Sequence, residues 1–246
     1  SFEEIDLENI LDDFIPRCRY KLLLEPTAID RPFSLGNPKK YSSYFKIFSR
    51  SMINPTNERC MFSSILPRGV SHVNSIRSIA ISKEEDLPAM CGIFSSLLID
   101  GIQRIKNKTN FYANDFLSIP IGENLQYIDS IGRRALCLNA LTLHYNDIWL
   151  KSVKLKKSDS LISGQEITGF GQTFKKEQTF RNKDIREQAT IEIDALTALL
   201  FDLTEEELVQ VYEILFPVMN MYDRERKFDR KAKLIEAHRF FKERGW

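Results

Sequence analysis

The strand-like segments of this sequence are gathered in its first third and helical segments follow them, which limits the folds open to the chain. Three short runs rich in β-branched and aromatic residues, at 44–49, 60–66 and 75–81, are separated by turn-forming residues, as expected for antiparallel strands. A run at 19–24 has the apolar density of another strand, and the Pro, Gly and Asn of 26–40 predict a loop. Strands followed by helices are typical of an α+β protein. We therefore expect a small, mainly antiparallel sheet with long helices.

Two long helices are predicted in the middle of the chain. Ser82-Lys83-Glu84-Glu85 has the pattern of a capping box, and the apolar residues that follow it recur at three-and-four spacing. This pattern predicts one helix over 87–105. A second helix is expected over 125–150, with Leu136, Leu143 and Trp149 in the core.

The second half of the chain begins with a polar stretch at 151–180, which shows little periodicity and reads as a linker or excursion, partly mobile. Helices are then expected over 186–201, from a cap at Thr204 to near Pro217, and over 229–243. The sequence thus predicts an α+β domain at 1–150, the polar stretch at 151–180, and a helical C-terminal subdomain at 181–246.

Several classes of protein are disfavoured by what the sequence lacks. It has no run of eighteen apolar residues and no basic-then-apolar opening, so we expect a soluble, cytoplasmic protein without a membrane span. The first residue is Ser and the opening reads like the middle of a chain, which suggests a fragment. The four cysteines lack a CxxC pair and the three histidines are scattered, so we expect core thiols and no metal site.

The net charge of +1 conceals an asymmetry along the chain. Residues 1–15 hold six acids and no base, and residues 158–246 hold 14 Lys and Arg against 17 Asp and Glu. The central residues 16–157 hold 21 Lys and Arg against 11 Asp and Glu, a net charge of +10. A segment this basic favours a polyanionic partner. The alternative is a surface that the acidic ends balance in three dimensions.

The common catalytic signatures are all missing. The sequence contains no GxGxxG, P-loop, GxSxG or HExxH motif, and no Asn/Asp-Pro-Pro-aromatic loop of an amino-methyltransferase. It also offers no convincing Glu-x-Lys in a strand, as a metal-dependent nuclease would need. We therefore expect no catalytic residue, no metal and no cofactor in this chain.

What remains are clusters suited to binding nucleic acid. Cations can neutralise phosphates, aromatic faces can stack on bases, and Arg and Asn can read guanine and adenine edges. The predicted DNA-binding residues are Lys39, Lys40, Tyr44, Arg50, Asn57, Arg59, Arg104, Lys106 and Lys108. For Arg50, Glu58 and Arg59, a structural ion pair that ties strands together is an equal alternative.

The order of several short motifs resembles a known family. FSSLLID at 94–100, Gln103-Arg104 and LSIPI at 117–121 resemble the C-terminal specificity region of N6-adenine DNA methyltransferases. More specifically, the chain is similar to the tail of type IIG-like bacterial restriction-modification methyltransferases and their phage-defence relatives. The motifs that carry this likeness are TNER at 56–59, ILP at 65–67, LNAL at 138–141, IDAL at 193–196 and LTEEEL at 203–208 followed by FPV at 216–218.

The resemblance implies a mixed target-recognition domain that binds duplex DNA and is not catalytic by itself. It also implies a methyltransferase domain of the same parent chain, N-terminal to Ser1, which would use S-adenosylmethionine and act on adenine, with or without an endonuclease. Position by position, Arg50, Asn57 and Arg59 fall in the family's polar strand-turn, and Arg104 and Lys106 at its helix end. The stretch 151–180 matches nothing in the family.

Two other functions stay open. The chain could be a docking scaffold within a restriction or phage-defence complex, with its acidic C-terminal helices on a partner. It could also be an independent enzyme if Glu192 and Asp194 met a metal ion, although positions on a helix surface are much the more frequent place for such residues.

Overall fold

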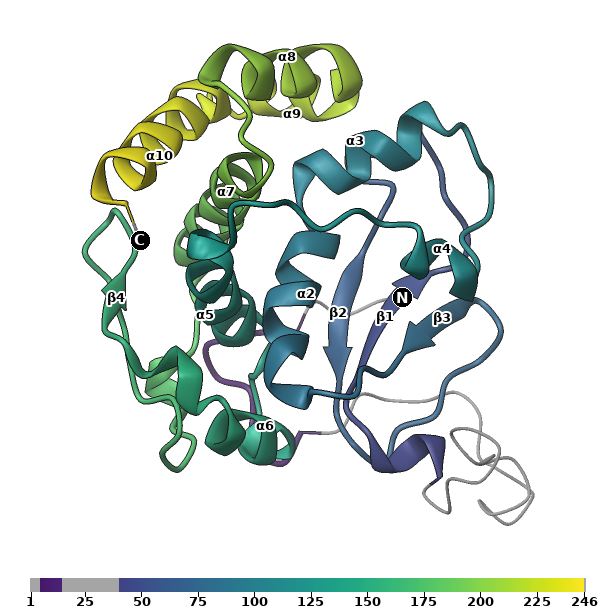
Figure 1. The fold of residues 1–246 in the computed structure, drawn as a ribbon, viewed down its shortest axis with the longest axis vertical. Coiled ribbons are helices and arrows are strands. Elements are labelled where there is room, and N and C mark those ends of the chain that lie inside the picture. The colour runs from purple at the N-terminus through teal and green to yellow at the C-terminus, as the bar shows by residue number, and fades with distance from the viewer. Residues whose placement is uncertain (1–4, 15–39, 246) are drawn as a thin grey trace.

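The computed structural model describes residues 5–14 and 40–245, and these form an α+β fold that is 52% helical (Figure 1). In the sheet, β1 (Lys46–Arg50) lies between β2 (Ser63–Leu66) and β3 (Ile76–Ile79), antiparallel to both. Ile47 faces Ile65 on one side and Ile79 on the other, so an apolar row crosses the sheet and can be covered by a helix. The predicted small antiparallel sheet is confirmed. The predictions for 19–24 and 26–39 lie outside the described residues.

The helices are stacked in layers away from the sheet. Helix α2 packs against β2, α5 against α2, α7 against α5, and α10 against α7, while α3 packs against α8 (Figure 1). Within the described residues the helices are α2 (Leu87–Phe94), α3 (Leu97–Ile105), α4 (Ala113–Leu117), α5 (Ile128–Asn139), α6 (Asn146–Lys151), α7 (Lys183–Leu200), α8 (Glu205–Leu215), α9 (Pro217–Glu225) and α10 (Arg230–Arg244). None of them is long and apolar enough to cross a membrane.

The helix predicted over 87–105 is two helices, broken at Ser95 and Ser96. Ser96 has extended backbone angles, and its hydroxyl accepts a hydrogen bond from the Ile99 N–H at the start of α3. The carboxylate of Asp194 on α7 accepts from the Leu97 N–H at 2.6 Å. Both acceptors satisfy backbone donors that a helix start leaves open, which is why the chain can turn here. The predicted cap at Ser82 is replaced by a 3-10 turn, Glu84–Asp86, whose N-cap, Lys83, makes no side-chain cap.

The helix predicted over 125–150 is also divided, into a 3-10 turn, α5 and α6. Asn139 at the end of α5 turns its side chain to the sheet, where its oxygen accepts from the Ile65 N–H at 2.9 Å. The chain then leaves the helix at Ala140. Leu136 and Trp149 are core residues as predicted, whereas Leu143 is 51% exposed. Close approach of α2 and α5 depends on Gly92, because a Cβ there would lie 2.5 Å from Ile131 Cγ2.

Helices α7, α8 and α10 follow their predictions, whereas α9 was not predicted. Thr204 and Glu207 form the capping box of α8, and Asp229 caps α10. Pro217, expected near the end of the helix that starts at Thr204, begins α9 instead, because proline is well suited to the first turn of a helix. Between Ala189 and Leu200 nearly every residue of α7 is buried, so α7 is the central helix of the molecule.

The stretch 151–180, predicted as a linker, packs on the rest of the chain. It forms a small hairpin, β4 (Asp159–Ser160) with β5 (Glu166–Ile167), and buries six hydrophobic side chains. Trp149 Nε1 donates to the Gly169 carbonyl, and the Trp149 ring lies 4.8 Å from that of Phe170. The buried residues are Leu155, Leu161, Ile167, Phe170, Phe174 and Phe180. Irregular spacing hid this apolar content, because periodicity detects only regular elements. A division of the chain near this stretch stays a prediction.

Candidate nucleic-acid interface

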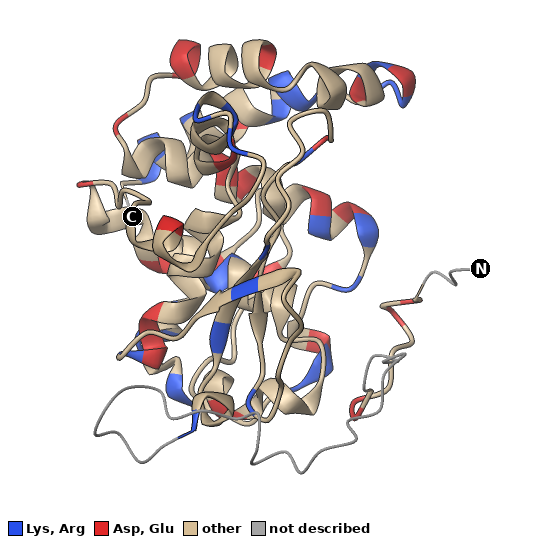
Figure 2. Ribbon diagram, turned by 90° about the vertical axis from the view of Figure 1, so that its right-hand side faces the viewer, with Lys and Arg blue, Asp and Glu red and all other residues tan. Residues whose placement is uncertain are grey.

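Two segments that carry six of the predicted DNA-binding residues lie side by side in the structure. Segment 50–59 follows β1, and segment 104–112 joins α3 to α4. Met52 and Asn110 form an antiparallel bridge, flanked by hydrogen bonds from Phe111 N to Ser51 O and from Ile53 N to Thr109 O. We call residues 50–59 and 104–112 together the loop surface. On the face shown in Figure 2, the sheet and the loops above it carry mostly basic positions.

Arg104 anchors the loop surface from inside. Its guanidinium donates to the carbonyls of Pro55, Asn57 and Glu58 at 2.6–2.9 Å and to the Asp100 carboxylate at 2.8 Å. The residue is only 9% exposed, and its guanidinium lies 4.4 Å from the centre of the Phe216 ring. The arginine predicted to contact DNA thus holds the turn 55–58 in shape, and little of its side chain reaches solvent.

Arg59 also faces the interior. Its Nη2 pairs with Asp194 Oδ2 at 2.7 Å, and the side chain is 13% exposed. Burial alone would lower the pKa of Arg59, but the neighbouring charges of Asp194 and Asp100 outweigh it and raise that pKa. The structural ion pair, one of two alternatives from the sequence, is the contact present here.

The exposed cations of the loop surface are Arg50, Lys106 and Lys108. Arg50 lies over the half-exposed ring of Phe62 at 5.5 Å, and Lys106 reaches Ser118 at 3.4 Å. Lys108 pairs with the Asp115 carboxylate while its side chain remains 44% exposed. Although burial raises the pKa of Asp115, hydrogen bonds from Lys108 and from the Tyr112 N–H outweigh it and hold the pKa below its usual value.

Amide side chains lie among these cations. Residues 105–110 are all exposed, including Asn107 and Asn110. Asn54 forms the turn by accepting from the N–H and hydroxyl of Thr56. The Asn57 side chain is half-buried, and its amide has no hydrogen-bond partner among the described residues. Such amides can donate to and accept from base edges.

The remaining predicted residues lie elsewhere. Lys40 and Tyr44, both half-buried, precede β1, whereas Arg50 ends it. Five residues of strand separate the two ends by about 15 Å. Lys39 lies outside the described residues. The predicted site is therefore brought together only in part.

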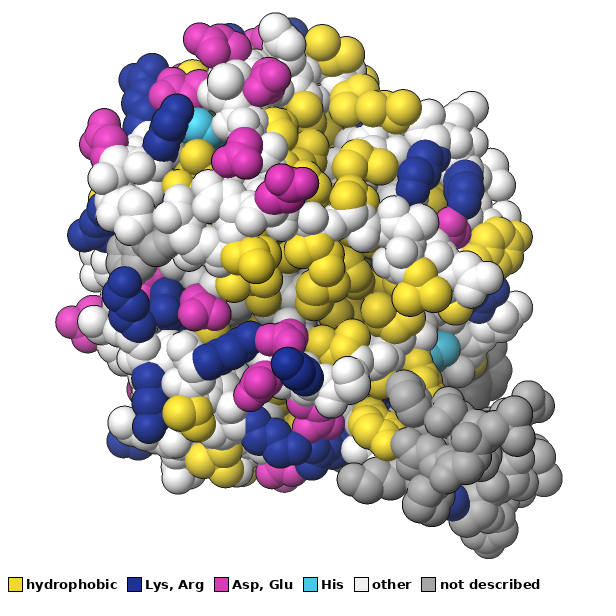
Figure 3. Space-filling model, viewed as in Figure 1, with side chains coloured by type: hydrophobic (Ala, Val, Ile, Leu, Met, Phe, Trp, Pro, Cys, Tyr) yellow, Lys and Arg dark blue, Asp and Glu magenta, His cyan; other side chains and the backbone are white. Residues whose placement is uncertain are grey.

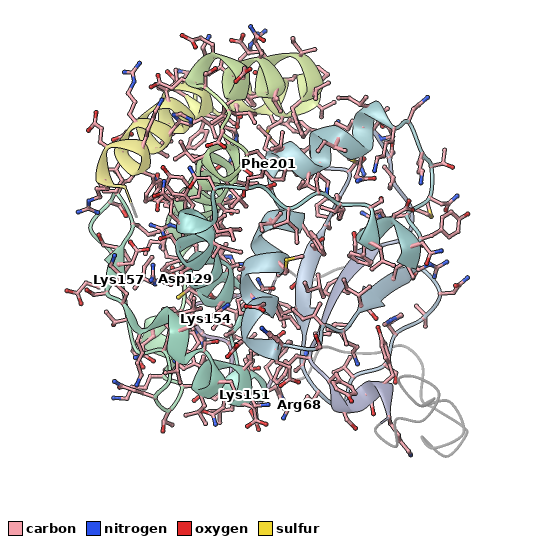
Figure 4. The ribbon with its side chains drawn as sticks, viewed as in Figure 1. Arg68, Asp129, Lys151, Lys154, Lys157 and Phe201 are labelled. Carbon is pink, nitrogen blue, oxygen red and sulfur yellow. The ribbon has the colours of Figure 1, made fainter. Side chains whose placement is uncertain are left out.

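A second basic group, at the lower end of the molecule in Figure 4, is neutralised locally. Arg68 and Lys151 both reach Glu84 Oε2 at 2.6 Å, and Lys154 pairs with Asp86. These cations belong to the basic segment 16–157 but have acidic partners within it. They are therefore less available to a polyanion than the cations of the loop surface.

A third basic group is buried. Arg134 on α5, fully buried, pairs through Nε with Glu192 and through Nη1 with Asp159, both at 2.7 Å. Arg133 pairs with the same Asp159 at 3.4 Å. Both acids come from the region beyond residue 157, so the balance of charge in three dimensions accounts for part of the +10 segment. Sequence reasoning missed this cluster, although two adjacent arginines in an apolar helix, Ile131 to Leu136, were a signal for it.

The carboxylates considered as metal ligands belong to these internal pairs. Glu192 and Asp194 are both fully buried, so the expectation of helix-surface positions is wrong. They project from opposite sides of α7, toward Arg134 and Arg59, because residues two apart on a helix point in different directions. No group of three or more His, Cys, Asp or Glu among residues 5–14 and 40–245 is placed to hold a metal ion.

Three cysteines are buried free thiols, as predicted. Burial, with the neighbouring Asp100 charge, raises the pKa of Cys60 to about 12, and its Sγ donates to Asp100. A thiol that keeps its proton at neutral pH is a poor nucleophile. These three are Cys60, Cys91 and Cys137; Cys18 lies outside the described residues.

No protein-family model, curated protein or solved structure matches this chain. Function therefore has to be inferred from the residues and their arrangement.

Proposed function

We propose that this chain is a DNA-binding specificity module, with the loop surface as its contact to duplex DNA. The observation that carries the proposal is the pairing of two exposed segments, 50–59 and 104–112, into one surface. Three exposed cations and several amides lie on it, and Arg104 holds it in a fixed shape. Fixed donors cost less conformational entropy to order on binding than a mobile loop.

The roles of the residues follow from their chemistry. Arg50, Lys106 and Lys108 would neutralise phosphates, and Asn57 with its neighbours would reach base edges. Tyr112 is 55% exposed at the same surface and offers an aromatic face. Arg59 and Arg104 would support the surface without touching DNA.

From the resemblance to type IIG-like methyltransferases, we infer that such a module would belong to a larger enzyme. There it would set the sequence on which a methyltransferase domain of the same parent chain acts with S-adenosylmethionine. In this role the chain would only bind DNA, and it would need no catalytic residue of its own.

The test is an anisotropy titration of labelled duplex DNA with the 246-residue chain over a range of salt concentrations. Three phosphate contacts predict that log K falls with log salt at a slope of about −2.7, from roughly −0.9 per contact. Asn57→Ala should lose about 1–3 kcal/mol on a preferred site and little on random DNA. Lys175→Ala with Lys176→Ala is the matched control, because these two exposed lysines lie on the 151–180 segment, away from the loop surface.

An absence of binding at low salt, even at tens of micromolar protein, would contradict the proposal. So would an equal loss of affinity in the control and in a Lys106→Ala, Lys108→Ala variant.

A protein-docking role is the second candidate, and an exposed apolar band favours it. Leu117, Ile121 and Leu125 are 49–82% exposed in the segment that joins α4 to α5. Figure 3 shows hydrophobic side chains gathered across this face. Exposed apolar patches of this kind mark interaction sites on many proteins. Failure of the DNA titration would make docking the leading function.

A further inference from the structure

A groove of about 710 Å³ lies between the sheet, the end of α5 and the start of α7, with α9 and α10 along its other side. This volume is within the range of small-molecule sites, about 300–1,000 Å³. Aromatic and aliphatic side chains form part of its lining, and hydroxyls and cations form the rest. The groove borders the loop surface at Glu58 and Arg59, but a ligand could bind in it whether or not the loop surface binds DNA.

Arg186 is the first sign of a ligand. Its Nη1 donates to the carbonyls of Leu138 and Phe180 at 2.9 and 2.7 Å, which fixes the side chain in the lining. No carboxylate lies within ion-pair distance of it among the described residues, and burial lowers the pKa of its guanidinium. A partly desolvated cation without a counter-ion is costly. An anion in the groove would compensate it.

Lys183 adds a second cation at the first position of α7. It is exposed and has no ion-pair partner among the described residues. Cations are disfavoured in the first turn of a helix, where the helix dipole is positive. The side chain of Asn182 already caps this turn. Stabilisation of the helix therefore does not explain why cations stand at positions 183 and 186. An anionic ligand would explain them.

The other charges of the lining are mostly paired within the protein. Arg226 and Arg230 contact Glu187 and Asp223 at 2.7–3.1 Å. With these pairs and Arg59–Asp194 set aside, the lining of this groove holds Lys183 and Arg186 against one acid, Glu58. Asp6 and Glu8 border the same two cations from a separate, neighbouring pocket. The groove therefore keeps a positive excess.

Two buried polar atoms of lining residues lack a hydrogen-bond partner among the residues that the structure describes. They are Arg59 Nη1 and Ser63 Oγ. Buried polar atoms are nearly always hydrogen-bonded. Both atoms are closed to solvent in this structure, so a ligand's oxygen atoms would reach them only after a small shift of the side chains around them.

The aromatic side chains of the lining indicate which chemical group the ligand carries beside its anion. Phe48, Phe62 and Tyr145 all border the groove, and Phe62 is 43% exposed. A half-exposed ring beside cations suits a planar, charged molecule. We propose that the groove binds a nucleoside monophosphate, with its phosphate at Arg186 and Lys183 and its base against the aromatic side chains.

The experiment is calorimetry of the 246-residue chain with adenosine 5′-monophosphate, adenosine, inorganic phosphate and benzoate. The monophosphate should bind one to one, and each of the others at least about tenfold more weakly. Adenosine lacks the phosphate and inorganic phosphate lacks the base, whereas benzoate has a ring but only a singly charged carboxylate in place of the phosphate. Absence of binding at millimolar monophosphate would overturn the proposal. Equal binding of phosphate or benzoate would overturn the assignment to a nucleotide.

Three variants sharpen the test. Arg186→Gln keeps an amide donor for the Leu138 carbonyl but removes the charge, and should weaken monophosphate binding by at least about tenfold. Ser63→Ala removes a hydroxyl that has no hydrogen-bond partner in the described part of the chain, so it should weaken binding several-fold without lowering the Tm. Arg181→Ala is the control, because Arg181 also donates to a carbonyl at the end of α5, that of Leu141, but does not line the groove.

Unchanged affinity in both Arg186→Gln and Ser63→Ala would overturn the site, as would an equal loss in Arg181→Ala. A failed DNA titration would leave these results as they stand, because no DNA is used. Failure of the nucleotide and failure of the DNA module are thus separate outcomes.

Discussion

The arginine cluster of α5 and the loop surface draw their cations from the same basic segment, yet they place them in opposite surroundings. Arg134 is fully buried and shared between Asp159 and Glu192. Lys106 and Lys108 stand on an exposed loop. The first group joins α5, α7 and the β4–β5 hairpin. The second remains exposed to solvent, although Lys108 also pairs with Asp115. The net charge of a segment therefore does not say which of its cations can meet a polyanion.

The largest effect is expected where the buried cluster is broken. Arg134→Met would leave the Asp159 and Glu192 carboxylates buried without their main partner, which costs about 3–5 kcal/mol. Burial alone would lower the pKa of Arg134, but the two carboxylates outweigh it and raise it, so the arginine stays charged in the folded state. Urea unfolding would measure the loss. Arg50→Ala is the control, and a similar loss in both would contradict the comparison.

A smaller loss is expected from the anchor of the loop surface. Arg104→Met removes the donor to three carbonyls. The Asp100 carboxylate still accepts hydrogen bonds from the backbone N–H groups of Cys60 and Met61. We expect a cost of about 2–3 kcal/mol in unfolding free energy. DNA affinity should fall as well, although Arg104 touches no DNA in the proposal. Full affinity in a folded Arg104→Met chain would show that the turn keeps its shape without the anchor.

The ion pair between Lys108 and Asp115 should make the stability of the protein depend on pH in the acid range. Because the pKa of Asp115 is held below its ordinary value of 3.8, its contribution to stability is present above that pH and is lost as the pH falls through the lower, folded-state pKa. Urea midpoints at pH 5 and pH 3 should therefore differ less in Asp115→Asn than in the unchanged chain. An identical pH dependence in the variant and in the unchanged chain would contradict the lowered pKa of Asp115.

The smallest change in stability is expected on the loop surface itself. Lys106→Ala should alter the unfolding free energy by no more than about 0.5 kcal/mol, because exposed side chains contribute little. Lys108→Ala should cost no more than about 1 kcal/mol, because it also removes the partly exposed ion pair with Asp115. The variant with both substitutions should make the salt slope of DNA binding shallower by about two. Large destabilisation with an unchanged slope would reverse the roles of the two regions.

Part of the candidate site could be predicted from residue types alone. Arg50, Lys106 and Lys108 are exposed on one surface, and the Asn57 amide of the same surface has no hydrogen-bond partner among the described residues. Arg59 and Arg104 carry the same charge but face inward. Their acidic partners are Asp194, distant in sequence, and Asp100, one turn of helix away. No local pattern separates an arginine that anchors a turn from one that meets a partner.

Local rules determined the elements that begin and end within a few residues. The capping box of Thr204 and Glu207 and the cap at Asp229 depend on side chains three residues from the donors they satisfy. The alternation of the strands likewise predicted the sheet and the α+β class. Such features are readable because both partners lie in one short stretch of sequence.

Tertiary structure decided what depends on distant partners. Helix 87–105 breaks where Asp194, 97 residues away, accepts the Leu97 N–H. The stretch 151–180 is ordered by Trp149 and by Arg134, through Asp159, and not by any periodicity of its own. In each case a buried polar group or an apolar side chain finds its partner only after folding. The free energy that fixes these segments therefore comes from contacts that the sequence does not place side by side.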